Sequence, residues 1–117
     1  MPQVNTYVLI PETSYVNPGN GAPYTVTGNA YPAASYYLSN QDLQTISYKL
    51  TGVTGNIVIE ASLDSNTGNA NWFNVLTVEA NNTTISAFEN VEGSFVYIRA
   101  KIEDFDSGTV QFVKASY

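Results

Sequence analysis

The stretch NIVIEASLDSNTGNANWFNVLTV, residues 56–78, decides the fold, because it holds two apolar segments on either side of a polar loop. Every second residue from Ile57 to Leu63 is apolar, and Val58, Glu60 and Ser62 lie between them. This period of two is the signature of a half-buried antiparallel strand. WFNVLTV, at residues 72–78, starts the next strand after the loop. The stretch therefore predicts two strands joined by a hairpin loop.

The same alternation continues on both sides of this hairpin, in QTISYKL (44–50), FVYIRAKIE (95–103) and TVQFVKASY (109–117). In the last run the apolar phase slips after Phe112, which predicts a β-bulge. Turn residues separate the runs at TGVTGN, DSNTGNAN, EANN, ENVEG and EDFDSG. No window of ten or more residues carries a helical stripe. We predict an all-β fold, an antiparallel, jelly-roll-like β-sandwich of about eight strands.

The first 41 residues have a different texture. All five prolines lie within the first 32 residues, and no Lys or Arg occurs before Lys49. Proline confines strands to sheet edges or extended arms. We therefore expect one domain, residues 1–117, in which residues 1–41 form an extended arm and edge strands and residues 42–117 form the core strands. We expect the first 20 or so residues to dock onto a neighbouring subunit, through Tyr7, Leu9 and Tyr15, and the rest of the arm to pack on its own sandwich.

Charge and composition exclude several classes of function. The chain of 117 residues has four Lys plus Arg and ten Asp plus Glu, for a formal charge of −6, which argues against nucleic-acid binding. It has no His and no Cys, and no acid pair stands in a catalytic context, so we expect no enzyme and no cofactor. We expect no signal peptide and no membrane span.

Only 12% of the residues are charged, about half the usual share. The polarity of the chain comes instead from neutral amides and hydroxyls, which lose less than ions do when they are covered. We therefore favour a protein that packs against others, as a homo-oligomer that is a trimer or a ring; the alternative is an exported or marine-type protein with a neutral surface.

Two acidic loops resemble calcium sites. They read D-x-N-x-G at 64–68 and D-x-D-x-G at 104–108, and their candidate ligands are Asp64, Asn66, Asp104 and Asp106. Calcium needs six to eight oxygen ligands, and neither loop has the later bidentate Glu of an EF-hand. The alternative, which we favour, is that these side chains cap turns. We therefore assign no metal site and expect folding without calcium.

Two further groups of residues have alternative interpretations. Trp72 is either a stacking platform for sugars or, with Phe73, the start of a strand that closes the end of the core. Arg99 and Lys101, beside Tyr97, form either an anion patch or cross-strand ion pairs with Glu60. We favour the strand and the ion pairs.

Most of the chain resembles a known family. The matching stretches are TGNIVIEASLDSNTGNANWFNVLTV (54–78) and NVEGSFVYIRAKIEDFDSGTVQFVKASY (90–117), together with MPQVNTYVLIPE (1–12) and YYLSNQDLQTISYKL (36–50). They resemble small virion structural proteins of marine tailed phages, chiefly T4-like cyanophages.

This resemblance implies a non-enzymatic virion protein, made in the host cytoplasm, that binds other virion proteins as a capsid decoration, a collar or neck component, or a fibre-associated subunit. It implies no catalytic residues. The alternative function is a carbohydrate-binding module for host-surface adhesion, with Trp72 in its site.

Overall fold

The computed structural model of the protein describes residues 6–16, 23–33, 42–64 and 71–117. These residues form seven antiparallel strands in one sheet that does not close on itself. The strands are β1 (Thr6–Ile10), β2 (Thr13–Ser14), β3 (Tyr24–Thr27), β4 (Tyr31–Pro32), β5 (Leu43–Ser62), β6 (Phe73–Glu92) and β7 (Tyr97–Ser116). The predicted all-β, antiparallel fold is confirmed. Nothing in the described part of the chain is a helix able to cross a membrane.

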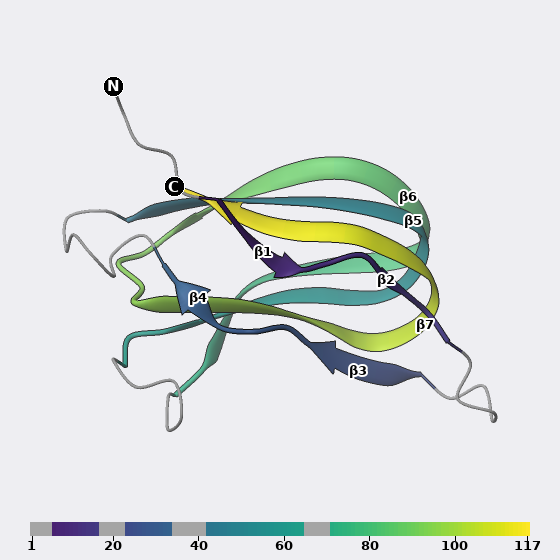
Figure 1. Ribbon diagram of the computed structural model, residues 1–117, viewed down its shortest axis with the longest axis horizontal. Helices are drawn as coiled ribbons and strands as arrows, with labels where there is room; N and C mark the ends of the chain where they lie inside the picture. Colours follow the sequence, from purple (N-terminus) through teal and green to yellow (C-terminus); the bar gives the residue numbers. More distant parts are fainter. Residues whose placement is uncertain (1–5, 17–22, 34–41, 65–70) are drawn as a thin grey trace.

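The three strands of 20 residues each, β5, β6 and β7, bend sharply near their midpoints, so that the sheet folds back on itself (Figure 1). The bends contain left-handed backbone at Gly52 (φ 60°), Asn82 (φ 50°), Asp104 (φ 53°) and Gly108 (φ 87°). Gly, Asn and Asp adopt this conformation most readily. Hydrogen-bonded register also shifts here, between Leu50 and Gly55 of β5.

These bends correct the predicted strand count. The expected turns TGVTGN, EANN and EDFDSG are bends inside continuous strands, because the chain goes on pairing with the same neighbours beyond them. The predicted strands 44–50 and 56–63 are thus the two halves of β5, and 95–103 and 109–117 are those of β7. In place of the roughly eight short strands that were predicted, the structure has three long strands and four short ones.

The second half of β6, residues 83–92, was missed, and its end was wrongly predicted as the turn ENVEG. β6 is the last strand in the order β1-β7-β5-β6. Most of its side chains are exposed on both faces. A strand at the border of a sheet carries a weak burial pattern, which explains why alternation did not reveal it.

The bends divide the sheet into two halves that enclose one core. The β1 half contains β1, β2 and the segments 43–50, 83–92 and 109–116, and the β3 half contains β3, β4 and the segments 56–62, 73–79 and 97–103. Both halves supply the buried core, which includes Ile46, Leu50, Val110, Val113 and Ala115 from the first and Ile57, Ile59, Ile98, Ala100 and Ile102 from the second. These are inward-facing positions that the alternation predicted. Leu63, also predicted inside, is 61% exposed, because it lies beyond the end of β5.

The predicted bulge in residues 109–117 is confirmed. Lys49 is opposite Phe112 and Leu50 is opposite Val110, so Gln111 is the extra residue of β7. The bulge turns Val113 back toward the core after Phe112, which is only partly buried.

The four short N-terminal strands all pair with β7, two on each half of it. The expectation of Pro-punctuated edge strands is therefore met for the described residues. The docking of the first 20 or so residues onto a neighbouring subunit stays a prediction, whereas in this structure residues 6–16 pack on the chain's own sheet. Leu9 and Ile10 are each only 1% exposed. Their apolar side chains gain more from this core than they would exposed on an arm.

Candidate functional site

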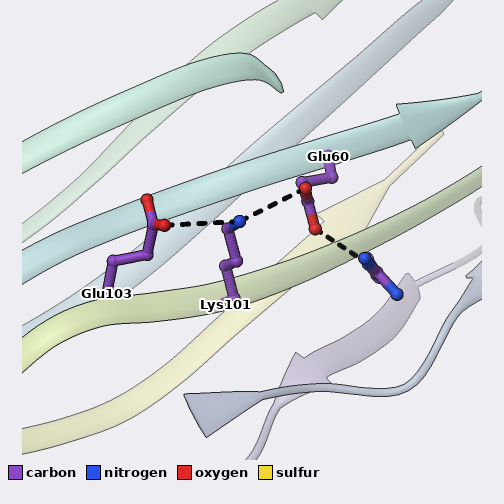
Figure 2. A network of polar contacts seen from close by, with 4 residues as sticks. Glu60, Lys101 and Glu103 are labelled. Carbon is purple, nitrogen blue, oxygen red and sulfur yellow. Dashed lines mark hydrogen bonds and ion pairs between the residues drawn. The ribbon is translucent and has the colours of Figure 1, made fainter. Parts of the chain in front are cut away.

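The most concentrated polar cluster of the described residues lies on the outer face of the β3 half (Figure 2). Alternation along β7 puts Arg99, Lys101 and Glu103 on this face, because Ile98, Ala100 and Ile102 point into the core. Glu60 of β5 lies directly opposite Arg99 in the antiparallel register. The sheet therefore brings two cations and two carboxylates together without any loop.

The cluster is closed by ion pairs within the chain. Arg99 Nε lies 2.8 Å from Glu60 Oε1, and Lys101 Nζ lies 3.3 Å from Glu60 Oε2 and 3.4 Å from Glu103 Oε2. The Glu60 side chain is only 8% exposed. A buried carboxylate needs such partners, since removal from water disfavours an unpaired charge. The prediction of cross-strand pairs is confirmed, and both cations are engaged by carboxylates of the chain itself.

The strand face beneath the cluster is buried as well. Val58 and Ser62, predicted on the solvent side of β5, are 1% and 0% exposed. β5 is the central strand of its half, between β6 and β7. The long side chains of neighbouring strands can cover such a position with their apolar stems. The alternation was correct, but the assignment of one face to solvent was wrong here.

Trp72 lies against this cluster and outside the core. The guanidinium carbon of Arg99 is 4.3 Å from the centroid of the indole ring, in cation–π geometry. Trp72 is half-buried, and its neighbours Asn71 and Asn74 are exposed. Phe73 begins β6, and its ring centroid lies 5.9 Å from that of Phe95, which packs on the core. The strand interpretation is confirmed for Phe73, whereas Trp72 caps the ion pairs.

The acidic loops hold turn geometry where they are described. The Asn71 N–H donates to Asp64 Oδ2 at 2.6 Å, and the Asp64 N–H donates to Ser62 Oγ at 3.0 Å. This is the capping role that the favoured interpretation gives to Asp64. Asn66 lies outside the described residues. Among those that are described, no three His, Cys, Asp or Glu side chains gather in a way that could hold a metal ion.

Asp104 and Asp106 belong to the bend of β7. Asp104 has the left-handed backbone conformation there. Asp106 lies close enough to Tyr15 to act on it electrostatically: burial raises the pKa of the Tyr15 phenol, and the Asp106 carboxylate and Tyr24 raise it further.

The predicted docking residues of the arm contact the chain itself. Leu9 is part of the core. The Tyr7 ring lies 5.4 Å from that of Tyr31, and the Tyr15 ring stacks on that of Tyr24, also at 5.4 Å. Between β1 and β3 there is a cleft of about 400 Å³ with mixed lining, formed by Val8, Leu9, Ile10, Pro11, Thr13, Val26, Thr27, Gly28, Asn29 and Tyr31.

Sequence reasoning missed the exposed border formed by β6. On β6, Phe88 is 66% exposed, Ile85 43% and Phe73 36%. Leu43 of β5, which pairs with Glu92 of β6, is 47% exposed. One signal was available in the sequence: no Lys, Arg or Pro occurs in residues 73–92. Edge strands usually carry such residues as protection against pairing.

Neither the family models nor the curated proteins that were searched include a match to the chain.

Proposed function

We propose that the chain is a non-enzymatic structural subunit of a phage particle, which binds other virion proteins as a capsid decoration, a collar or neck component, or a fibre-associated subunit. The support is the resemblance of residues 54–78 and 90–117 to virion proteins of marine tailed phages, together with the character of the surface. Its place of action is the virion, after synthesis in the host cytoplasm.

One observation carries the proposal. Large apolar side chains are exposed on the surface, while the charged groups of the densest polar cluster pair with one another. Val16 is 69% exposed, Phe88 66% and Leu63 61%. Glu60, Arg99 and Lys101 satisfy one another. A surface that is low in charge and carries apolar groups suits permanent contact with other proteins.

The folded sheet supports the same proposal. We infer that its two halves act as the two layers of a jelly-roll-like β-sandwich, although hydrogen bonds continue from one half to the other through the bends. Such a unit is stiff, because three strands belong to both layers. A stiff subunit with apolar borders suits a homo-oligomer, and we propose a trimer or a ring.

Imaging of purified particles tests the proposal. Electron cryo-microscopy should find the bent sheet as a repeated density on the head, neck or tail, and mass spectrometry of the same particles should detect the chain. Particles that lack the chain would overturn the proposal, whatever the purified protein does in solution.

A carbohydrate-binding module for host-surface adhesion is the second candidate, and the position of Trp72 favours it. The ring lies on the outer face beside exposed Asn71 and Asn74, and Arg99 holds it from one side. Aromatic rings flanked by amides bind sugar rings through stacking and hydroxyl hydrogen bonds.

Trp72 is the only tryptophan, so its fluorescence reports this site directly. Host-derived glycans should change the emission and should lose binding in Trp72→Ala but not in Phe88→Ala. A glycan array without a Trp72-dependent signal would remove this candidate.

A further inference from the structure

The two borders of the sheet are built differently. The border beyond β7 consists of four short strands interrupted by Pro11 and Pro32, with a register shift in β1. The other border is β6, which pairs only with β5 among the described residues. Short strands, prolines and bulges prevent the pairing of edges, and a long regular edge invites it. The pairing of β6 with β5 shifts register near the bend and again between Ile59 and Glu60 of β5, but residues 85–92 pair without a shift. This half of β6 is thus the unprotected part of the border (Figure 1).

The second half of β6, residues 84–92, presents the most exposed apolar group of this border. Thr84, Ser86, Phe88, Asn90 and Glu92 alternate on the outer face, and all five are exposed. Phe88 stands at their centre. Its pairing partner on β5 is Ser47, whose side chain is too small to cover a phenyl ring.

Positive and negative charges balance over the whole of the β1 half, although its pairing segment, residues 84–92, carries two carboxylates and no cation. The strand segments of this half carry Lys49 and Lys114 against Glu89 and Glu92, two positive and two negative charges, although the whole chain has a formal charge of −6. The excess of acids lies largely in loops and bends, at Glu12, Asp42, Asp64, Asp104 and Asp106. Because the β1 half has no excess of negative charge, its charge does not favour a basic partner over a second copy of the chain.

We propose that residues 84–92 of β6 pair with the same residues of a second copy, as antiparallel edge strands related by a two-fold axis at Phe88. In this register Phe88 faces Phe88 of the second copy, Ser86 faces its Asn90, and Thr84 faces its Glu92. On the inner face Ile85 meets Val91 and Ala87 meets Glu89 of the second copy. No carboxylate lies directly opposite another, the two Glu89 side chains being diagonal neighbours across the axis, and the two phenyl rings cover each other on the axis.

This inference rests on the proposed role as an oligomeric structural subunit and names one of its contacts. A two-fold contact is isologous and produces a dimer by itself. Combined with a different contact elsewhere on the chain, it joins trimers or rings in pairs. Continuation of the β1 half across the axis yields one sheet shared by the two copies.

The first test exchanges charges on the axis. The wild-type protein should sediment as a dimer at micromolar concentration, or as paired trimers or rings if the other contact also forms in solution. Phe88→Lys and Phe88→Glu should each lose this pairing, because like charges then meet on the axis, and a mixture of the two variants should regain it. Leu63→Lys, an equally exposed apolar position away from the border, should retain the pairing.

The second test uses the natural absence of cysteine. Paired residues on antiparallel strands have Cα atoms about 4.5–5.5 Å apart, within disulfide range. Phe88→Cys should therefore form covalent dimers under mild oxidation. Ser86→Cys alone should not, because the two copies of residue 86 lie four positions apart, roughly 13 Å. A mixture of Ser86→Cys and Asn90→Cys should cross-link.

A wild-type monomer at these concentrations would overturn the proposal, and so would a dimer that forms no Phe88→Cys disulfide. If Phe88→Lys does not fold, the cysteine variants decide alone. If the protein is monomeric but Phe88→Lys lowers incorporation into particles, then β6 pairs with another virion protein and the second copy is excluded. A dimer with the expected disulfides that is absent from particles supports the edge pairing and overturns only the virion role.

Discussion

Gly108 shows at the scale of a single residue why β7 can bend. It combines a positive φ of 87° with very close backbone: a Cβ at this position would lie 2.4 Å from the carbonyl of Gly52 and 2.6 Å from that of Thr51. No side chain fits there without movement of one of the bends. Gly52 has a similar φ of 60°, but a Cβ would meet nothing nearer than 3.7 Å.

We predict that Gly108→Ala lowers the free energy of unfolding by about 3 kcal/mol or more, because left-handed strain and overpacking add together. Gly52→Ala, the control, should cost about 1 kcal/mol, from backbone conformation alone. Urea unfolding of both variants measures the difference. If both variants lost the same free energy of unfolding, the steric clash at Gly108 would contribute nothing to stability.

Arg99 links the ion pairs to the indole ring of Trp72. We predict that Arg99→Ala destabilises the protein by about 1–2 kcal/mol, since it leaves the buried Glu60 with one cationic partner. The fluorescence of Trp72 should shift to the red, because its ring loses the guanidinium and gains water.

Lys114→Ala is the matched control for Arg99→Ala. Lys114 also lies over an aromatic ring, 4.3 Å from the centroid of Phe112. It makes no ion pair in the described structure, so its removal should cost less than about 0.5 kcal/mol. Chemical denaturation and emission spectra provide both measurements. An Arg99→Ala variant as stable as Lys114→Ala would mean that water replaces the guanidinium at Glu60.

At the scale of elements, hydroxyl groups join the three bends. The Gly52 N–H donates to Thr84 Oγ1 at 2.9 Å, the Asn82 N–H donates to Thr54 Oγ1 at 3.0 Å, and Ser107 Oγ donates to the Gly52 carbonyl at 3.0 Å. These bonds satisfy backbone groups that the irregular register leaves without ladder partners. The bends of β5, β6 and β7 therefore form one unit.

β1 is the element whose role the sequence described least well. Leu9 is 1% exposed and Val8 is 41% exposed. We predict that Leu9→Ala destabilises the protein by about 3 kcal/mol, whereas Val8→Ala costs less than about 1 kcal/mol.

Deletion of residues 2–20 should consequently yield a chain that does not fold stably, and not the folded sandwich that a docking arm would leave behind. Circular dichroism and thermal melts of the three variants test this role. A truncated protein with a wild-type melting temperature would show that β1 contributes little to the core.

For the whole molecule, stability should fall at high pH. Burial raises the pKa of Tyr48, and the Glu89 carboxylate raises it further; the pKa of Tyr15 is raised in the same sense. Because the folded-state values lie above the ordinary value of 10.0, the unfolded chain loses these protons first. The stability contributed by the neutral phenols is complete below about pH 10 and is lost as the pH rises through the folded-state values.

Denaturant unfolding between neutral pH and pH 11 measures this dependence, with Tyr48→Phe as the comparison. The variant has no phenol to ionise at this position, so its stability should fall less steeply than that of the wild type above about pH 10. Equal slopes would contradict the assignment to Tyr48.

The sequence by itself determined the fold class, the inward-facing residues and several local features. Alternation identified Ile57, Ile59 and Ile98 as core, and the phase slip predicted a bulge within residues 109–117. The pairing of Glu60 with Arg99 followed from opposite charges on adjacent strands. These features depend on a period of two and on nearest neighbours in a sheet, which are local properties.

Only the tertiary structure decided which turn-like segments end a strand and which bend it. Gly, Asn and Asp with left-handed backbone occur both in turns that end a strand and in bends within a strand, so the sequences TGVTGN and EDFDSG are compatible with either structure. The difference is whether the chain continues beside the same neighbour, and that depends on residues far away in the sequence. The same holds for the burial of Leu9, for the covered outer face at Val58 and for the open border of β6, because each depends on which strands lie alongside and not on the segment itself.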